Sequence, residues 1–522
     1  MEALKEKLKH EIPGFLQAGK EYKEKKISKM DFKHKSGGMG VYAQRSGQDF
    51  MIRLRLMSGV MDVEQLKLIY GYARKYQLKR MHLTTRQTIQ LHDMDITEIC
   101  ELMEAALEDD IYTRGGGGNY PRNVSLSPLS GVAVDEVFDV TPFALLVNEH
   151  FLLDITNYHL PRKLKVSFSN NAKDTGRATI NDLGFMAVED QGKPYFKLYL
   201  CGGLGNNPLK SLEYDELIPP EDVLYYVDGM VKFYMQEGNY ENRAKARTRY
   251  IAMRMGKEEV IEGYKACVEE IKRTKKLREL SATLVSKSDN LSGEECPDGC
   301  IRQRQEGRYT VVIHPVGGQL DLEDCKALID FLEGKEGIEL RLNMDESMHV
   351  RNLSKEDAIK LLKITSHYNH QERIYHSIAC IGVPTCQIGI GHSQEVMREI
   401  MNAVQKQGVG LGKLPILHIS GCNNSCARHQ VATLGFAGTK TKVDGQVEDA
   451  FEVFAGGKVG KDITCFGESY GVIPSKQMPN FICELANELE RSGKEFEEFY
   501  QTEEFEALVQ GYTPKVDLTT SK

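Results

Sequence analysis

Hydrophobic and polar residues alternate in short segments that recur in the same order in both halves of the chain. The segment Phe50-Met-Ile-Arg-Leu-Arg-Leu56 alternates in the manner of a strand, and Tyr309-Thr-Val-Val-Ile-His314 is a similar apolar segment. Each is followed by a glycine turn, a pattern of helical period, a second predicted strand (80–90 and 339–349) and another helix. The pattern therefore predicts strands and helices arranged in two related copies.

The two copies align without gaps at a spacing of 259 residues over their most similar part. Five identities fall in this register: Gly59 with Gly318, Asp62 with Asp321, Glu64 with Glu323, Lys67 with Lys326, and Leu83 with Leu342. With small gaps, Leu183-Gly-Phe185 recurs as Leu434-Gly-Phe436, and Gly202-Gly203 as Gly456-Gly457. We predict an internal duplication whose halves face each other across a pseudo-twofold axis.

Composition and charge are those of an ordinary globular protein. The 522 residues, 41% hydrophobic and 27% charged, suffice for three or four domains of about 150 residues each. A net charge of −8 gives no reason to expect nucleic acid as a partner. The amino terminus is charged throughout and the longest apolar region is interrupted by polar residues, so we expect a cytoplasmic protein without a membrane partner.

A charged, helix-favouring stretch at residues 242–291 lies between the copies. It carries Arg243, Lys245, Arg247, Arg249 and Arg254. One interpretation is a solvated helix face or linker. The other is contact with an acidic cofactor or an electron donor, and the pattern leaves both open.

Four of the twelve cysteines form two close pairs: Cys380 with Cys386 (C-x5-C), and Cys422 with Cys426 (C-x3-C). Structural zinc sites favour short spacings, whereas the thiolates of an iron-sulfur cluster bind different irons and tolerate varied spacing. Small, turn-forming neighbours would let the backbone approach a bulky inorganic group. The spacing favours a cluster and leaves zinc or unrelated buried thiols as alternatives.

The other cysteines are less informative. Cys296 and Cys300 form a rival C-x3-C pair without a second close pair, so we interpret them as a turn with incidental thiols. The remaining cysteines occur singly in apolar or helical contexts and are expected to be packing residues: Cys100, Cys201, Cys267, Cys325, Cys465 and Cys483.

Together with the paired cysteines, three segments resemble the sirohaem-dependent sulfite and nitrite reductase family. They are Leu83-Thr-Thr-Arg-Gln-Thr-Ile-Gln-Leu-His92, Pro121-Arg-Asn-Val-Ser-Leu-Ser-Pro-Leu-Ser-Gly131 and Leu160-Pro-Arg-Lys-Leu-Lys165. All follow the family order, which makes the combination specific although each motif is short. Asn423 departs from the family pattern, which usually has Pro there, and this could loosen the turn before Cys426.

The resemblance implies an α+β fold, the internally duplicated nitrite/sulfite reductase fold, with pseudo-twofold ferredoxin-like halves and α/β domains that bind sirohaem and the Fe-S cluster. We expect a first ferredoxin-like half-domain with an N-terminal extension at 1–110, and a first sirohaem-binding domain with a helical linker at 111–290. A second ferredoxin-like half-domain is expected at 291–365. A second domain with the cluster cysteines and C-terminal helices is expected at 366–522.

The resemblance also implies two cofactors, a 4Fe-4S cluster and sirohaem. Cys380, Cys386, Cys422 and Cys426 would hold the cluster, and Cys426 would also be axial to the sirohaem iron. Sirohaem carries several carboxylates, so its pocket needs cations and amide donors. The matching positions are Thr84, Arg86, Gln90, His92 and Asn424. The alternation of Arg86, Gln90 and His92 predicts one shared strand face.

Four cations match the anion-binding positions of the family: Arg53, Arg122, Lys163 and Lys165. Such a cluster attracts a small oxyanion, polarises its bonds and can supply protons. Arg53 lies in an apolar predicted strand, where a charge facing inward is costly without an anionic partner. Arg114 and the run Gly115-Gly-Gly-Gly-Asn119 either belong to the site or form a flexible loop.

The resulting hypothesis is an oxidoreductase that reduces sulfite to sulfide with six electrons from an external donor such as ferredoxin. A second ammonium in Lys163-Leu-Lys165 suits a dianion better than the monoanion nitrite. Reduction of nitrite to ammonia, or of both anions, is the near alternative, and a non-catalytic iron-sulfur protein for electron transfer or redox sensing is the distant one. No G-x-G-x-x-G follows a predicted strand, which argues against a flavin or nicotinamide site.

Overall fold

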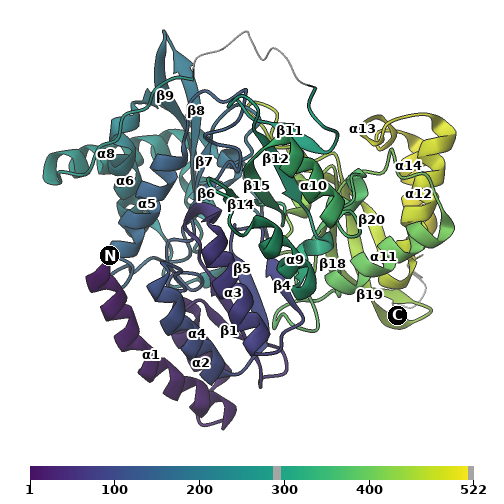
Figure 1. Cartoon of the computed structure of the whole chain (residues 1–522), viewed down its shortest axis with the longest axis horizontal. Helices are drawn as coiled ribbons and strands as arrows, with labels where there is room; N and C mark the ends of the chain where they lie inside the picture. Colours follow the sequence, from purple (N-terminus) through teal and green to yellow (C-terminus); the bar gives the residue numbers. More distant parts are fainter. Residues whose placement is uncertain (286–294, 515–522) are drawn as a thin grey trace. The chain divides into compact units, whose positions relative to one another are not determined.

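The computed structural model describes residues 1–285 and 295–514, and the chain divides into two compact units. Unit 1 comprises residues 1–203, 208–313 and 319–366, and unit 2 comprises residues 204–207, 314–318 and 367–522. Figure 1 shows both units and labels their elements where there is room. Across the described ranges, no helix is both long and apolar enough to cross a membrane.

Unit 1 contains two five-stranded sheets built to one plan. The strands of the first half are β1 (Val41–Ala43), β2 (Phe50–Leu54), β3 (Val60–Met61), β4 (Arg80–Leu83) and β5 (Ile89–Met94). Those of the second half are β11 (Cys300–Arg302), β12 (Tyr309–Ile313), β13 (Gln319–Asp321), β14 (Glu339–Leu342) and β15 (Met348–Leu353). The sheet orders are β1-β2-β5-β4-β13 and β11-β12-β15-β14-β3. Each half therefore gives one strand to the sheet of the other.

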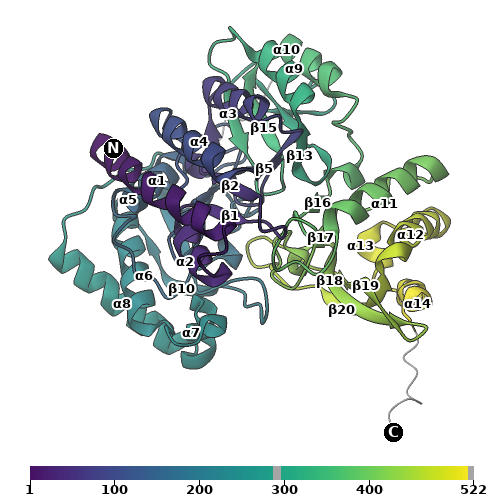
Figure 2. The ribbon, with the colours of Figure 1, turned by 90° about the horizontal axis from the view of Figure 1, so that it is seen from below.

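The helices of these sheets follow the same repeat. Helices α3 (Val63–Lys75) and α9 (Leu322–Leu332) begin 259 residues apart, as do α4 (Ile96–Glu108) and α10 (Lys355–Thr365). Helices α3 and α9 pack against each other. Figure 2 shows both in the region of strands β5, β13 and β15. The predicted duplication is therefore confirmed in the order and spacing of the elements, and the exchanged strands β3 and β13 join its halves into one unit.

The prediction of one continuous second strand in each half, at 80–90 and at 339–349, is wrong. Each of these segments belongs to a β-hairpin of two strands. Strand β4 ends at Leu83 and β5 begins at Ile89, and Gln87 in the turn has a φ of 53°. The second copy turns in the same way, with Glu346 at a φ of 67°. The turn at 84–88 contains neither glycine nor proline, so its sequence lacks the usual signals. Arg86 consequently lies in a turn and does not share a strand with Gln90 and His92.

Two further sheets share a second plan, one in each unit. Unit 1 has β6 (Ser125–Leu126), β7 (Val166–Ser169), β8 (Leu183–Asp190), β9 (Lys193–Leu200) and β10 (Leu212–Ile218) in this spatial order. Unit 2 has β16 (Ile378–Ala379), β17 (Leu417–Ser420), β18 (Leu434–Val443), β19 (Gln446–Ala455) and β20 (Glu468–Pro474). In each sheet the first three strands are parallel and the last two antiparallel.

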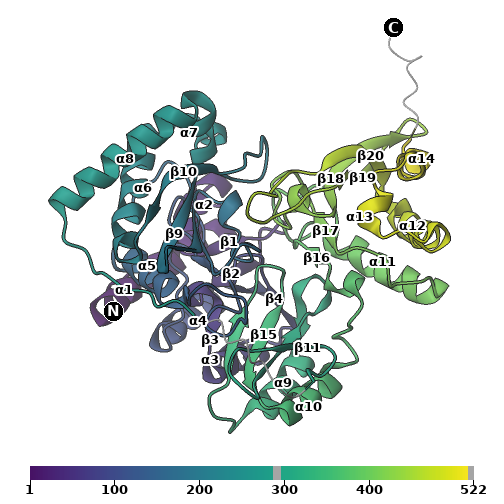
Figure 3. The same ribbon diagram turned by 90° about the horizontal axis from the view of Figure 1, so that it is seen from above.

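The remaining helices cover these sheets and extend the amino terminus. In unit 1 they are α1 (Glu2–Lys23), α2 (Lys29–Gly38), α5 (Thr141–Leu153), α6 (Val223–Glu237), α7 (Thr248–Met255) and α8 (Lys257–Thr274). In unit 2 they are α11 (Ser393–Gln407), α12 (Met478–Ser492), α13 (Phe496–Phe499) and α14 (Glu503–Tyr512). Figure 3 shows α11, α12 and α14 beside β17 to β20. Their apolar faces and the sheet enclose one core that includes Phe436, Phe451 and Phe481, and this core holds the ends of β16 and β17 in place.

Candidate functional site

The four predicted cluster cysteines lie in two loops of unit 2 that follow neighbouring parallel strands. Cys380 directly follows β16, and Cys422 lies two residues beyond the end of β17. Because β16 and β17 are parallel, their carboxyl ends meet at the same edge of the sheet. Hydrogen bonds join the loops at this edge: the Cys380 N–H donates to the Ile419 carbonyl at 3.1 Å, and the Gly421 N–H donates to the Cys380 Sγ at 3.0 Å.

Gly421 allows the two cysteine loops to pack backbone against backbone. A Cβ at this position would lie 2.9 Å from the Gly391 carbonyl oxygen and 3.1 Å from the Gly382 Cα. The N–H groups of Ile390 and Gly391 both donate to the Gly421 carbonyl at 2.8 Å. These bonds hold the loop of Cys386 against the loop of Cys422.

The turn between Cys422 and Cys426 is closed although Asn423 replaces the usual Pro. The Ser425 N–H donates to the Cys422 carbonyl at 3.3 Å, and Ser425 adopts a φ of 53°. The Asn424 amide donates to the Cys422 Sγ at 3.3 Å, so this side chain lies beside a cluster cysteine. The expected loosening of this turn is therefore not seen.

Three of these thiols lie close enough for the charges of two to act on the third. Burial raises the pKa of the Cys380 thiol, and the neighbouring Cys426 and Cys386 thiols raise it further. Within the described parts of the chain, no three His, Cys, Asp or Glu side chains converge closely enough to hold one metal ion. A 4Fe-4S cluster distributes its thiolates over several irons, whose positive charge keeps them deprotonated. Cysteines on two adjoining loops are a donor set that can hold such a cluster.

The other cysteines separate into two groups. Cys100, Cys201, Cys267, Cys325 and Cys483 are buried, which confirms that they are packing residues. Cys465 is exposed, so its prediction was wrong. It forms an isolated β-bridge with Lys458, where the apolar neighbours of its sequence do not cover it. In unit 1 the Cys296 thiol donates to the Cys300 carbonyl at 3.4 Å, consistent with a turn.

Arg53, Gln90 and His92 form a connected group on neighbouring strands of unit 1. Arg53 in β2 pairs directly with Gln90 in β5. With the Gln90 amide assigned from its hydrogen bonds, its oxygen accepts from Arg53 at 2.7 and 3.0 Å, and its nitrogen donates to the His92 Nε2 at 3.3 Å. His92 therefore carries its proton on Nδ1, which is buried and has no hydrogen-bond partner among the described residues.

Two buried histidines remain neutral in this group. Burial and the charge of Arg53 lower the pKa of His92 to about 3. Burial, His92 and Arg53 lower the pKa of His82 to about 3, and the Gln319 amide donates to the His82 Nδ1 at 2.8 Å. Gln319 belongs to β13, the strand contributed by the second half, so the duplication supplies part of this site.

Thr84 and Arg86 occupy the hairpin turn before β5. The Thr84 hydroxyl lies 2.7 Å from the Thr88 hydroxyl. The Arg86 guanidinium donates to the Ser125 hydroxyl and, at 3.3 Å, to the Asn181 amide oxygen. Arg86 thus reaches from the first sheet to strand β6. That strand belongs to the segment 121–131, one of the three segments that carry the family resemblance.

The predicted anion-binding cations converge in unit 1. Burial lowers the pKa of Lys163 well below its ordinary value, and the charges of Lys165, Arg247, Arg122 and Arg162 lower it further. Arg122 donates to the Gly116 and Gly118 carbonyls at 2.7 and 2.9 Å, and Arg53 also donates to Gly116. We call these residues the cation cluster: Arg53, Arg122, Arg162, Lys163, Lys165 and Arg247.

Sequence reasoning left Arg247 undecided and missed Asp182. Arg247 donates to both carboxylate oxygens of Asp182 at 2.9 Å, and both side chains are buried. The linker interpretation therefore fails at Arg247, while residues 286–291 of that stretch lie outside the described residues. A signal was present, because Asp182 precedes the repeated Leu-Gly-Phe segment, where the second copy has Thr433.

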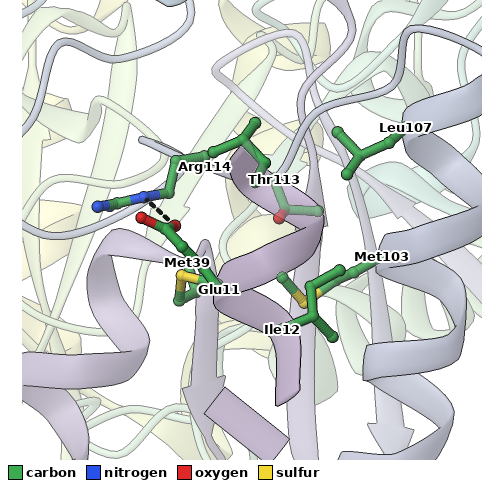
Figure 4. Close-up of a pocket in the computed structure, with 8 residues that line it drawn as sticks. Glu11, Ile12, Met39, Met103, Leu107, Thr113 and Arg114 are labelled. Carbon is green, nitrogen blue, oxygen red and sulfur yellow. Dashed lines mark hydrogen bonds and ion pairs between the residues drawn. The ribbon is translucent and has the colours of Figure 1, made fainter. Parts of the chain in front are cut away.

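The glycine run at 115–118 is closely packed and supports the cations. A Cβ at Gly117 would overlap the Tyr42 hydroxyl and the Gly37 carbonyl. Arg114, by contrast, forms an ion pair with Glu11 at 3.0 Å and lies over the Tyr120 ring. Figure 4 shows this ion pair beside a small crevice lined by Met39 and the apolar side chains of α1 and α4. Arg114 is thus engaged with the N-terminal helix.

The cation cluster fits a polyanionic ligand. Six cations converge here, and the Asp182 carboxylate contacts Arg247 directly. The buried Nε atoms of Arg122 and Arg247, like the His92 Nδ1, donate to no group in the part of the chain that the structure describes. Buried cations and donors are costly without anionic acceptors. The carboxylates of a macrocycle and a small oxyanion would satisfy these donors.

Comparisons with known proteins give a consistent result. The family "Nitrite and sulphite reductase 4Fe-4S domain" matches residues 117–272, and "Nitrite/Sulfite reductase ferredoxin-like half domain" matches residues 42–109. The assimilatory ferredoxin-dependent nitrite reductase of Haloferax mediterranei is 24% identical, over 91% of this chain and 86% of the relative. The chloroplastic ferredoxin–nitrite reductase of Arabidopsis thaliana is 26% identical, over 85% of this chain and 77% of the relative.

A sulfite reductase and one solved structure complete the comparison. Sulfite reductase [ferredoxin] 1 of Mycolicibacterium paratuberculosis is 23% identical, over 83% of this chain and 81% of the relative. The structure of the Mycobacterium tuberculosis NirA protein superposes with a TM-score of 0.76 at 21% identity and covers 92% of both chains. That likeness confirms the duplicated α+β fold.

Proposed function

Because the chain belongs to the nitrite and sulfite reductase family, we propose that it reduces a small oxyanion by six electrons, with nitrite as the preferred substrate. The observation that carries this proposal is the cation cluster, in which the buried Nε atoms of Arg122 and Arg247 have no acceptor among the described residues. The family implies sirohaem and a 4Fe-4S cluster, which supply the electron transfer to the substrate when bound. The residues of this chain would bind the oxyanion, orient it and protonate it.

We assign the cluster to Cys380, Cys386, Cys422 and Cys426, and Cys426 would also help to hold the sirohaem. The shared edge of β16 and β17 and the mutual influence of the thiols support this assignment. Asn424 supports it by its hydrogen bond to the Cys422 Sγ. For the macrocycle we propose Thr84, Arg86, Gln90, His92 and Asn424, and the buried His92 Nδ1–H supports this because it is a donor in need of an acceptor.

Arg53, Arg122, Lys163 and Lys165 would hold the oxyanion. Guanidinium groups bind planar oxyanions by paired hydrogen bonds, and the carbonyls of Gly116 and Gly118 fix the orientation of Arg122. Lys163 is suited to proton transfer, since its lowered pKa makes it a better proton donor than an ordinary lysine. An arriving anion would favour the charged form of Lys163 and so bring a proton to the substrate.

The choice of nitrite reverses the preference for sulfite that the Lys163-Leu-Lys165 motif suggested. Most of the named relatives are ferredoxin–nitrite reductases, and one is a sulfite reductase. We propose ferredoxin as the electron donor, on the strength of the names of these relatives.

Anaerobic steady-state kinetics would test this proposal. Reduced ferredoxin and reduced methyl viologen would each be supplied with nitrite and sulfite side by side. We expect a kcat/KM for nitrite at least about tenfold above that for sulfite, equivalent to about 1.4 kcal/mol in transition-state binding. The variant Lys165→Asn should widen this ratio, because it removes a positive charge that favours a dianion.

Two outcomes would contradict the proposal in different ways. A higher kcat/KM for sulfite would keep the reductase and reverse the substrate. A protein that contains an iron-sulfur cluster but shows no sirohaem absorption and reduces neither anion would instead be a non-catalytic electron-transfer or redox-sensing protein.

A further inference from the structure

Tyr42 lies among the cations of unit 1, although no sequence motif points to it. It is the central residue of β1, beside Arg53 of the neighbouring strand β2. The guanidinium carbon of Arg53 lies 6.0 Å from the centroid of the Tyr42 ring, within the range of a cation–π contact. The Tyr42 hydroxyl accepts a hydrogen bond from the Gly118 N–H at 3.0 Å.

Hydrogen-bond donors and positive charges lie close to this hydroxyl. Arg53, Arg122 and Arg162 are the charges that act on the phenol, and guanidinium groups can only donate. The Gly118 N–H is also a donor. A tyrosine hydroxyl has one proton of its own, and among the described residues no group accepts it. That proton is therefore available to an acceptor that the protein does not supply.

The chain builds this environment with a specific backbone. Gly117 must lack a side chain, because a Cβ there would overlap the Tyr42 hydroxyl. The same loop presents the Gly118 N–H to the phenol, and the Gly116 and Gly118 carbonyls to Arg122. One loop thus orients both the phenol and the guanidinium, which brings them to the same side of the cation cluster.

We propose that Tyr42 is a further catalytic residue, which donates its hydroxyl proton to an oxygen of the bound oxyanion. This proposal rests on the proposed function, because it requires an oxyanion in the cation cluster. The Tyr42 O–H bond breaks and a new O–H bond forms on the substrate oxygen. The external one-electron donor reduces the central atom of the substrate, the bond from that atom to oxygen breaks, and the oxygen leaves as water after a second proton arrives. Water then returns a proton to the phenolate.

The electrostatics of the cluster support this role. Burial raises the pKa of the Tyr42 phenol, but Arg122, Arg53 and the Gly118 N–H outweigh burial, and the net pKa lies below its ordinary value. A general acid is most effective when its pKa is close to the working pH. The nearby arginines would also stabilise the transient phenolate, whose charge they neutralise.

The test compares Tyr42→Phe with a matched control, Tyr22→Phe. Tyr22 also lies in unit 1, where its ring stacks on Phe32 at 4.6 Å and remains after the hydroxyl is removed. In Tyr42→Phe we expect kcat for nitrite to fall by about 100-fold, a typical loss for a general acid, while KM changes by less than about threefold. Tyr22→Phe should retain the wild-type kcat.

A second readout is independent of turnover. The chain has 23 tyrosines. In a pH titration of the cofactor-free protein, the ultraviolet difference spectrum should show that one of them forms tyrosinate at lower pH than the others. This early step should be absent from Tyr42→Phe and present in Tyr22→Phe. Added nitrite should move the step to higher pH, because a bound anion opposes formation of the phenolate.

The outcomes separate this proposal from the proposed function. If Tyr42→Phe keeps kcat within about twofold and an unchanged pH profile, Tyr42 is not a proton donor, although nitrite reduction stands. If the wild type reduces neither anion, the proposed function itself fails. Should Tyr42→Phe not fold, 3-fluorotyrosine at position 42 keeps the shape and lowers the pKa of the phenol. The pH–rate profile must then shift to lower pH, and an unshifted profile overturns the proposal.

Discussion

Replacement of Asp182 by Asn should destabilise unit 1, because this carboxylate compensates a buried arginine. Both oxygens of Asp182 accept from Arg247 at 2.9 Å, and the Lys165 N–H donates to the same carboxylate at 2.8 Å. Asp182→Asn keeps the shape of the side chain but leaves Arg247 buried beside Lys163 without a counter-charge. The position of Asp182 in the sequence would not by itself predict this loss of stability.

Loss of one partner from a buried ion pair costs about 3 to 5 kcal/mol. Asparagine retains one acceptor for Arg247, so the lower end, about 3 kcal/mol, is expected in the cofactor-free protein. With an entropy of unfolding of about 2 cal/mol/K per residue, this corresponds to a fall in the midpoint of thermal unfolding of about 4 °C for a unit of this size. Sulfate should restore more of the midpoint in Asp182→Asn than in the wild type, because an anion replaces the missing charge.

The control is Asp174→Asn, a second buried carboxylate in unit 1. Among the described residues, Asp174 accepts hydrogen bonds from neutral groups only, the Ala178 and Thr179 N–H groups and the hydroxyls of Ser169 and Thr179. Its replacement should also lower the midpoint, but sulfate should have the same effect on it as on the wild type. Thermal unfolding at several sulfate concentrations measures both. A loss below about 1 kcal/mol for Asp182→Asn, or an equal response to sulfate in both variants, would refute the reasoning.

Two further predictions concern acid stability and cluster assembly. Because the pKa of His82 is lowered to about 3, stability is lost as pH falls from about 6.5 to about 3, by about 1.4 kcal/mol per pH unit for this residue. In the cofactor-free protein, His82→Gln should flatten the plot of unfolding free energy against pH in that window, and an unchanged slope would contradict the low pKa. Gly421→Ala should reduce the iron content per chain, because its Cβ would press on the Gly391 carbonyl at 2.9 Å. Gly412→Ala, which meets no atom within 4 Å, should leave iron content and circular dichroism unchanged, and equal iron in both variants would count against the close approach of the loops.

Much of the fold was predictable because both copies of the duplication show the same local pattern of hydrophobic and polar residues. Residues that set strand and helix period recur at a spacing of 259, and the elements they form begin at that spacing. The β-hairpin at 84–88 was not predictable in the same way, because the residues of its turn lack glycine and proline. Hydrogen bonding within the folded sheet selects the turn that the local sequence does not signal.

Some residues of the candidate site could be predicted from local sequence, and others could not. The cysteine pairs could be found from spacing, because each pair lies within one loop and the two loops follow neighbouring strands of one sheet. Asp182, Tyr42 and Gln319 carry no motif, and they acquire a role only from the side chains that meet them. The proposed domain boundaries at 110, 290 and 365 stay predictions, and the second lies outside the described residues.

By itself, the sequence determined the repeat, the candidate cluster ligands and the cations that an oxyanion site requires, since each depends on residue type at short range. The tertiary structure alone decided which of these residues meet. Exchange of β3 and β13 between the halves brings Gln319 to His82, and the pairing of β2 with β5 brings Arg53 to Gln90. Such contacts join residues far apart in the chain, so they depend on strand pairing and on the electrostatics of burial, which local sequence patterns do not record.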